Sequence, residues 1–117
     1  MEKLDVRNDL VNKERARLKR IFSNVEENKM KIVEGLIMQA ARLKILLDEM
    51  WIDISEKGDY ELFSQSEKLE PYERERPVAK LYNSRDQSYQ KVIKQLIDLL
   101  PAPEQEDAKG YVEDDLL

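Results

Sequence analysis

The sequence predicts an all-α protein, and three observations lead to this class. Residues 24–57 contain no proline and only one glycine before Gly58 closes the stretch. Apolar residues recur within it at steps of three and four, which is the period of one helical face. Charged residues make up 38% of the chain and aromatic residues only 7%, a balance typical of helical proteins with a large surface. At 117 residues we expect a single domain followed by a tail.

The first helix is expected over residues 4–22, where a weak apolar stripe is formed by Leu10 or Val11, Leu18, Ile21 and Phe22. Its second half is strongly basic and carries net +4 over eight residues. The cations are Lys13, Arg15, Arg17, Lys19 and Arg20, against the single acid Glu14. Two interpretations stay open. Cations suit the negative end of a helix dipole, and a basic run is also an electrostatic footprint for phosphates.

The long central helix is expected to start at Ser23 or Asn24, because each is followed three residues later by a glutamate, as in a capping box. With the first helix it forms either a helix-turn-helix or a simple helical hairpin. Lys29 and Lys31 add positive charge to its first turns, where the dipole does not favour cations.

The central helix carries a heptad seam. Its members are Leu36, Ala40, Leu43, Leu47, Met50 and Ile54. A helix of about 50 Å is longer than so short a chain is expected to cover. The sequence therefore predicts that part of this seam contacts another copy of the chain. The alternative is that the helix is only the core helix of a small bundle.

The second half of the chain is expected to contain a loop, a helix and a tail. Residues 58–76 lack a helical period, so we expect an irregular or short β loop held by Tyr60, Leu62 and Phe63. Pro77 suits the first turn of a helix that Pro101 and Pro103 end. The oligomerisation core predicted on this helix is Tyr82, Tyr89, Ile93, Leu96 and Leu100.

The tail, residues 102–117, is expected to be disordered when free, because it is acidic and poor in apolar residues. Its apolar anchors are Tyr111, Val112, Leu116 and Leu117. Two roles stay open for it: a peptide that docks on a partner, or an extension that only improves solubility.

The residue types present point away from catalysis. The chain has no cysteine and no histidine, and its three glycines are scattered, so no nucleophile, common metal ligand or phosphate loop stands out. We expect no enzyme activity, no metal, no cofactor and no small-molecule substrate. No apolar run is long enough for a membrane span, and no signal peptide opens the chain, so a cytosolic protein is expected. A nucleic-acid-binding module, a helical adapter and a structural oligomer remain.

Two stretches together carry a family resemblance. The first is Arg17-Leu18-Lys19-Arg20-Ile21-Phe22-Ser23-Asn24, then Asn28-Lys29, Glu34-Gly35-Leu36-Ile37, Ala40-Ala41 and Leu47-Asp48-Glu49-Met50. The second is Arg76-Pro77-Val78-Ala79, then Leu81-Tyr82-Asn83, Tyr89 and Ile93-Lys94-Gln95-Leu96-Ile97-Asp98-Leu99-Leu100-Pro101. Over most of residues 15–101 the chain resembles the small terminase subunits of tailed bacteriophages and prophages. It departs from them in its loop, which lacks a Gly- and Asn-rich character, and in its longer tail.

The resemblance implies a role in viral genome packaging within the host bacterial cytoplasm. Small terminase subunits form closed rings, bind the packaging site on double-stranded viral DNA, and recruit and regulate the large subunit, which carries the ATPase and the nuclease. On this interpretation residues 1–57 serve DNA binding and oligomerisation, residues 58–76 connect, residues 77–101 complete the oligomerisation core, and residues 102–117 bind the partner. The predicted DNA-binding residues are Lys13, Arg15, Arg17, Lys19, Arg20, Lys29 and Lys31. The competing interpretation is a helical oligomeric adapter or scaffold that does not bind DNA.

Overall fold

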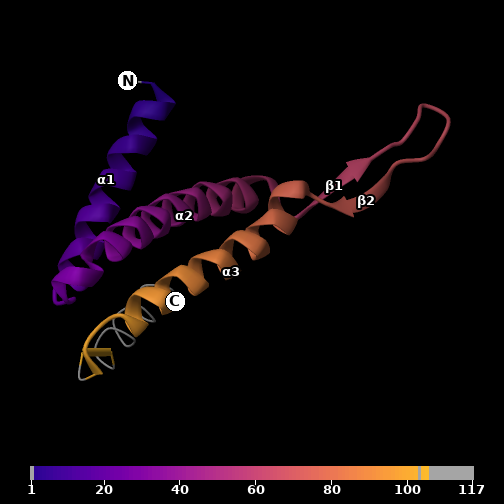
Figure 1. Ribbon diagram of the computed structural model, residues 1–117. Helices are drawn as coiled ribbons and strands as arrows, with labels where there is room; N and C mark the ends of the chain where they lie inside the picture. Colours follow the sequence, from indigo (N-terminus) through magenta and orange to yellow (C-terminus); the bar gives the residue numbers. More distant parts are fainter. Residues whose placement is uncertain (1, 103, 106–117) are drawn as a thin grey trace.

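The computed structural model describes residues 2–102, 104 and 105. Three long helices dominate this part of the chain: α1 (Lys3–Ile21), α2 (Met30–Lys57) and α3 (Pro77–Asp98). A short 3₁₀ turn, η1 (Glu27–Lys29), precedes α2, and a two-stranded antiparallel hairpin of β1 (Tyr60–Phe63) and β2 (Tyr72–Glu75) joins α2 to α3 (Figure 1). The predicted helical class is therefore confirmed, with the connecting loop folded as a short β element.

The link between α1 and α2 differs from the predicted capping box. The hydroxyl of Ser23 donates a hydrogen bond to the carbonyl of Arg20, at the end of α1, and no side chain caps α2. The central helix begins at Met30, seven residues after Ser23 and six after Asn24, the two predicted starts. Phe22 and Val25 are both buried, and burying these two side chains keeps the linking backbone against the core instead of in a first helical turn.

Helix α2 lies between the other two helices and packs against both (Figure 1). Its buried residues cover a wide arc of the helix. They are Val33, Ile37, Ala40, Ala41, Ile45, Leu47, Met50 and Ile54. Ala40 and Ala41 are completely buried, and their small side chains let the neighbouring helices approach closely. Among the described residues, no helix is both long and apolar enough to cross a membrane.

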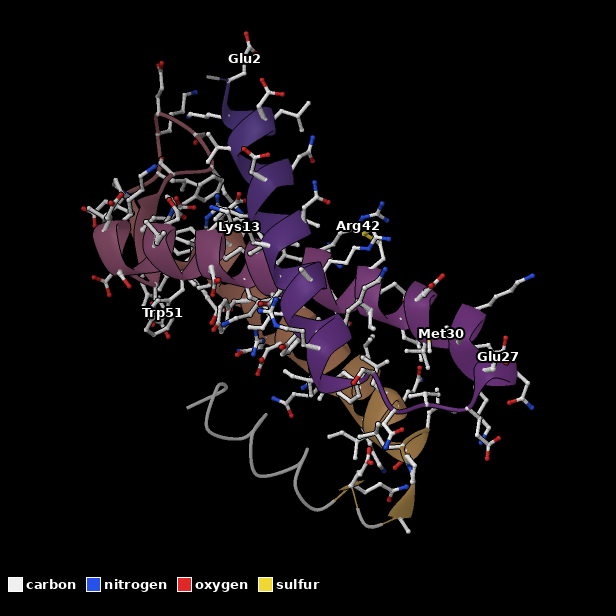
Figure 2. The ribbon with its side chains drawn as sticks, turned by 90° about the vertical axis from the view of Figure 1, so that its left-hand side faces the viewer. Glu2, Lys13, Glu27, Met30, Arg42 and Trp51 are labelled. Carbon is white, nitrogen blue, oxygen red and sulfur yellow. The ribbon has the colours of Figure 1, made fainter. Side chains whose placement is uncertain are left out.

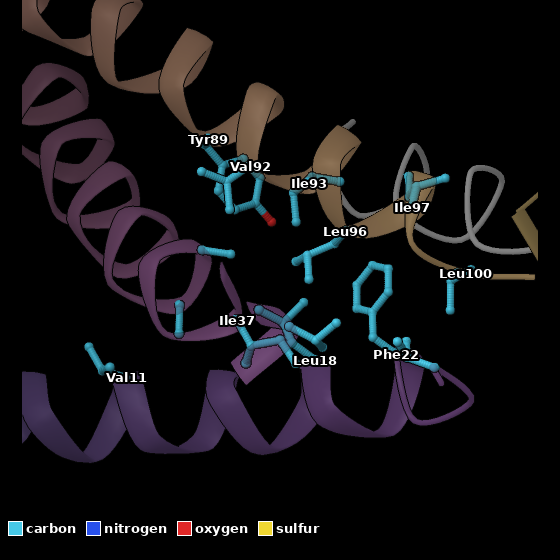
Figure 3. Packing of buried hydrophobic residues seen from close by; sticks show 14 of the residues in the cluster. Val11, Leu18, Phe22, Ile37, Tyr89, Val92, Ile93, Leu96, Ile97 and Leu100 are labelled. Carbon is cyan, nitrogen blue, oxygen red and sulfur yellow. The ribbon is translucent and has the colours of Figure 1, made fainter. Parts of the chain in front are cut away.

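The densest packing lies where the C-terminal halves of α1 and α3 meet the N-terminal half of α2. Leu18 from α1, Phe22 directly after it, Ile37 from α2 and Leu96 from α3 point toward one another there, with Leu100 at the edge (Figure 3). Each of these five side chains is at most 4% exposed. Since all three helices contribute, this junction fixes their relative positions.

The end of α3 is reached earlier than expected. The helix ends at Asp98, and the amides of Glu104 and Gln105 donate hydrogen bonds to the carbonyl of Pro101. Glu104 also accepts a hydrogen bond from the side-chain amide of Asn24. Backbone and side-chain hydrogen bonds thus hold Glu104 and Gln105 against the helical body, and the disorder expected of the tail stays a prediction.

Candidate nucleic-acid interface

The basic run of α1 does not form one continuous surface. Lys13, Arg17 and Arg20 are spaced by four and three residues and therefore share one side of the helix. Arg15 and Lys19 share another side, roughly 150° away at 100° per residue. The solvent-facing arc between the two stripes carries Asn12 and Ala16, and the core-facing residues Val11, Leu18 and Phe22 lie on the other side of the helix. A single straight phosphate backbone can therefore contact one stripe of a given helix, and not both.

Arg17 is already engaged within the chain. Its guanidinium donates two hydrogen bonds of 2.6 Å to the carboxylate of Glu14, and the two side chains are only 24% and 10% exposed. Glu14 is the buried charged residue of the described core, and this bidentate pair satisfies it. Arg17 is better explained as the partner of Glu14 than as a free cation for DNA.

Four cations of the run remain accessible for phosphate. Lys13, Lys19 and Arg20 are exposed, and Arg15 is partly exposed. None of the four has an ion pair with another residue in the described part of the chain. Lys13 and Arg20 therefore define a first basic stripe, and Arg15 and Lys19 a second.

The two lysines at the start of the central helix occupy different environments. Lys29 lies in η1 and makes a long ion pair of 3.8 Å with Glu26, which weakens its attraction for phosphate. Lys31 is exposed on the first turn of α2. Because the capping prediction placed both residues inside the helix, the structure changes the surroundings of Lys29 more than those of Lys31.

Sequence reasoning missed several exposed cations. Arg42 projects from α2 into solvent (Figure 2), although the residue before it, Ala41, is fully buried. On α3, Lys80, Lys91 and Lys94 are exposed on the side opposite the buried Tyr89 and Leu96. The signal was available in the spacing, since residues 80, 87, 91 and 94 lie seven, four and three apart and carry only Lys and Gln.

The predicted oligomerisation residues are mostly used inside the chain. Of the seam, Ala40, Leu47, Met50 and Ile54 are buried, and Leu36 and Leu43 pack against the same core. Tyr89, Ile93, Leu96 and Leu100 are likewise buried, and Tyr82 is partly buried, with its ring 5.8 Å from that of Trp51. Most of the seam is thus packed within one chain, since α3 folds back along α2, and the contact of the seam with another copy stays a prediction.

Large apolar side chains that are exposed lie outside the seam. On α2, Ile32, Trp51 and Ile52 are 60%, 57% and 57% exposed, and two further groups lie on α1 and on the hairpin. The first is the N-terminal half of α1, with Leu4, Val6 and Leu10 at 63%, 44% and 42% exposure. The second is the hairpin, where Tyr60 and Leu62 are 62% and 73% exposed. These exposed side chains, rather than the heptad seam, are available for contacts with other molecules.

Two further predictions concern chemistry and the tail. Within residues 2–102 and 104–105, no three acidic side chains gather closely enough to hold a metal ion. The predicted anchors Tyr111, Val112, Leu116 and Leu117 lie outside the described residues.

Comparisons with protein-family models, with curated proteins and with solved structures found no match to this chain. Its function must therefore be argued from its own residues: accessible cations on two sides of a helical hairpin, and exposed apolar side chains outside the core.

Proposed function

We propose that this chain is a small terminase subunit, which binds viral packaging-site DNA as an oligomeric ring and recruits and regulates the large terminase subunit. The proposed family rests on the motifs of residues 15–101, which resemble those of small terminase subunits. The accessible cations of the helical hairpin provide a means of binding DNA. The large subunit is the proposed partner of the acidic tail.

The observation that carries the DNA-binding part is the division of the basic run into two stripes without competing acids. Lys13 and Arg20 form one, and Arg15 and Lys19 form the other. Two phosphate contacts give one subunit only weak, salt-sensitive binding. In a ring each subunit offers a further copy of both stripes to the same duplex, so the combined affinity rises steeply without any stronger single contact.

A helical adapter that does not bind DNA is the second candidate, and the pairing of Arg17 with Glu14 favours it. Arg17, in the middle of the run, forms a partly buried ion pair with Glu14 of the same chain. The net charge of residues 1–22 is then carried mainly by groups near the helix end, where cations are stabilising for a purely local reason.

Paired Lys/Arg→Gln variants separate the two candidates. One variant carries Lys13→Gln and Arg20→Gln, and another carries Arg15→Gln and Lys19→Gln. A matched control carries Lys91→Gln and Lys94→Gln, which removes the same charge from α3. DNA affinity is measured as a function of salt by fluorescence anisotropy with a labelled duplex, and the oligomer mass of each variant is measured by light scattering.

We expect at least one α1 pair to weaken binding and to reduce the salt slope by about 2 per subunit contact, with the control pair close to the unmodified protein. Equal losses in all three variants would show only general attraction to a basic surface. No loss in either α1 variant, with the mass unchanged, would support the adapter and reject DNA binding by α1.

A further inference from the structure

One face of the hairpin is apolar and acidic and is left bare. Side chains alternate along a strand, so Tyr60 and Leu62 lie on the same face. Their cross-strand partners are Glu75 and Glu73, which share that face. We call these four residues the hairpin face. Tyr60 and Leu62 are 62% and 73% exposed, and no described residue covers them.

The opposite face of the hairpin is covered by its own side chains. The guanidinium of Arg74 lies 3.5 Å from the centroid of the Phe63 ring and pairs with Glu61 at 2.8 Å. Tyr72 meets Phe63 edge to face, with centroids 6.0 Å apart. Because stacking and ion pairing occupy this side, the hairpin face is the one suited to contact a partner.

The hairpin is held in a defined direction. Arg76 is only 14% exposed and donates hydrogen bonds of 2.7 Å to the carbonyl of Gly58 and to the carboxylate of Asp53. This ties both strand ends to the last turns of α2. In Figure 1 the hairpin extends beyond the ends of α2 and α3. An arm that is oriented before binding loses little entropy when it docks.

A groove on the N-terminal half of α1 has complementary properties. It has a volume of about 560 Å³ and is lined by Lys3, Leu4, Val6, Arg7, Leu10 and Glu49. We call it the α1 groove. Arg7 donates hydrogen bonds of 2.9 and 2.7 Å to Glu49, which spans the gap between α1 and α2 and raises the pKa of Arg7. Lys3 has no ion pair with any described residue.

Charge in the two regions is opposite in sign. The hairpin face carries Glu73 and Glu75, net −2, whereas the α1 groove carries Lys3, Arg7 and Glu49, net +1. Around the α1 helix, the acids Asp5 and Asp9 lie on the side away from Lys3, Arg7 and Leu10. The groove therefore presents cations and apolar side chains together, and the hairpin face presents carboxylates and apolar side chains together.

We propose that the hairpin face of one copy docks into the α1 groove of a second copy. Tyr60 and Leu62 contact Leu4, Val6 and Leu10, and Glu73 and Glu75 meet Lys3, the cation of the groove that has no ion pair with a described residue. Figure 1 shows the hairpin and the N-terminal half of α1 well apart within one chain. Each copy thus offers one arm and one groove, which is a head-to-tail contact that forms a ring when the rotation closes. The inference rests on the proposed ring and identifies the surfaces that hold it.

The test uses two variants that each destroy one surface. Leu62→Asp places a charge on the hairpin face, and Leu10→Asp places one in the α1 groove. Both side chains are substantially exposed, so each variant should keep the fold, which circular dichroism verifies. Leu81→Asp is the matched control, because Leu81 is 47% exposed on α3 and belongs to neither surface. Masses are measured by light scattering at tens of micromolar protein.

The proposal predicts a specific pattern. Each of the first two variants alone is monomeric, while the control assembles like the unmodified protein. A mixture of Leu62→Asp and Leu10→Asp forms a one-to-one dimer and nothing larger, because the intact arm of one fits the intact groove of the other and both remaining surfaces are blocked. Monomers in the mixture, assembly by either variant alone, or a monomeric unmodified chain would overturn the proposal.

The same samples separate this inference from the proposed function. If the unmodified protein assembles through these surfaces but does not bind DNA, the contact stands and the DNA-binding role fails. If the protein assembles and binds DNA while both variants keep their full mass, the proposed function stands and the hairpin contact is wrong.

Discussion

Replacing Leu96 by alanine tests the three-helix junction directly. Leu96 is completely buried and points toward Leu18, Phe22 and Ile37 in Figure 3. The substitution removes three carbon atoms, worth about 2.4 kcal/mol at about 0.8 kcal/mol each. A cavity that the rigid helices cannot close adds to this, so we expect a total loss of about 3–4 kcal/mol in the free energy of unfolding.

The matched control is Leu81→Ala, the same chemical change at an exposed position of the same helix. It should cost less than about 1 kcal/mol. Urea unfolding followed by circular dichroism measures both. With a slope of about 1.5 kcal/mol/M, the midpoint of Leu96→Ala should fall by about 2 M.

Protein concentration adds a second criterion. Because the neighbours of Leu96 belong to the same chain, its loss of stability should not depend on concentration. A loss of stability below about 1 kcal/mol would refute the assignment of Leu96 to the internal core. A loss that appears only at concentrations where the protein assembles would instead place Leu96 at an interface between copies.

Two further predictions concern the ends of α2. Gly35→Ala should stabilise the protein by about 0.5–1 kcal/mol, because no atom lies near an added Cβ and alanine favours a helix interior. Gly58→Ala should destabilise the protein by about 1–3 kcal/mol, because the backbone φ of Gly58 is +82°. Thermal unfolding of both variants checks these opposite signs. Hydrogen bonding from Arg76 lowers the pKa of Asp53 below 3.8, so its stabilising effect is present above that pH and is lost as pH falls through the lowered pKa. The difference in melting temperature between the unmodified protein and Asp53→Asn should therefore shrink in acid, and a difference that is constant with pH would contradict this role.

Helical periodicity made the three helices predictable from the sequence. Pro77 begins α3 and Gly58 closes α2, as their backbone preferences require. The start of α2 was not predictable in the same way. Ser23 and Asn24 have the side chains of capping residues, but neither caps α2, and the nearby Val25 is buried in the core.

The partners of an apolar face could not be read from periodicity. A heptad seam shows that one side of a helix will be covered, and it does not show by which chain. Here Tyr89, Ile93 and Leu96 of α3 contribute to the core that includes the seam residues Ala40 and Leu47. The division of the basic run into two stripes could have been predicted, since Arg15 and Lys19 differ from Lys13 in helical phase. The i,i+3 spacing of Glu14 and Arg17 also allows their pair, but only the structure shows that Glu14 is buried.

The projecting hairpin makes the molecule long, which affects how it diffuses. The principal extents are 63 × 33 × 22 Å and the radius of gyration is 18.2 Å, whereas a compact chain of this length has about 13 Å. Such a shape experiences more friction than a sphere of equal mass, so a single copy migrates through a gel-filtration column like a larger compact protein. Closure of a ring through the arms would remove this extension from each copy, and the friction per subunit should then fall as the mass rises.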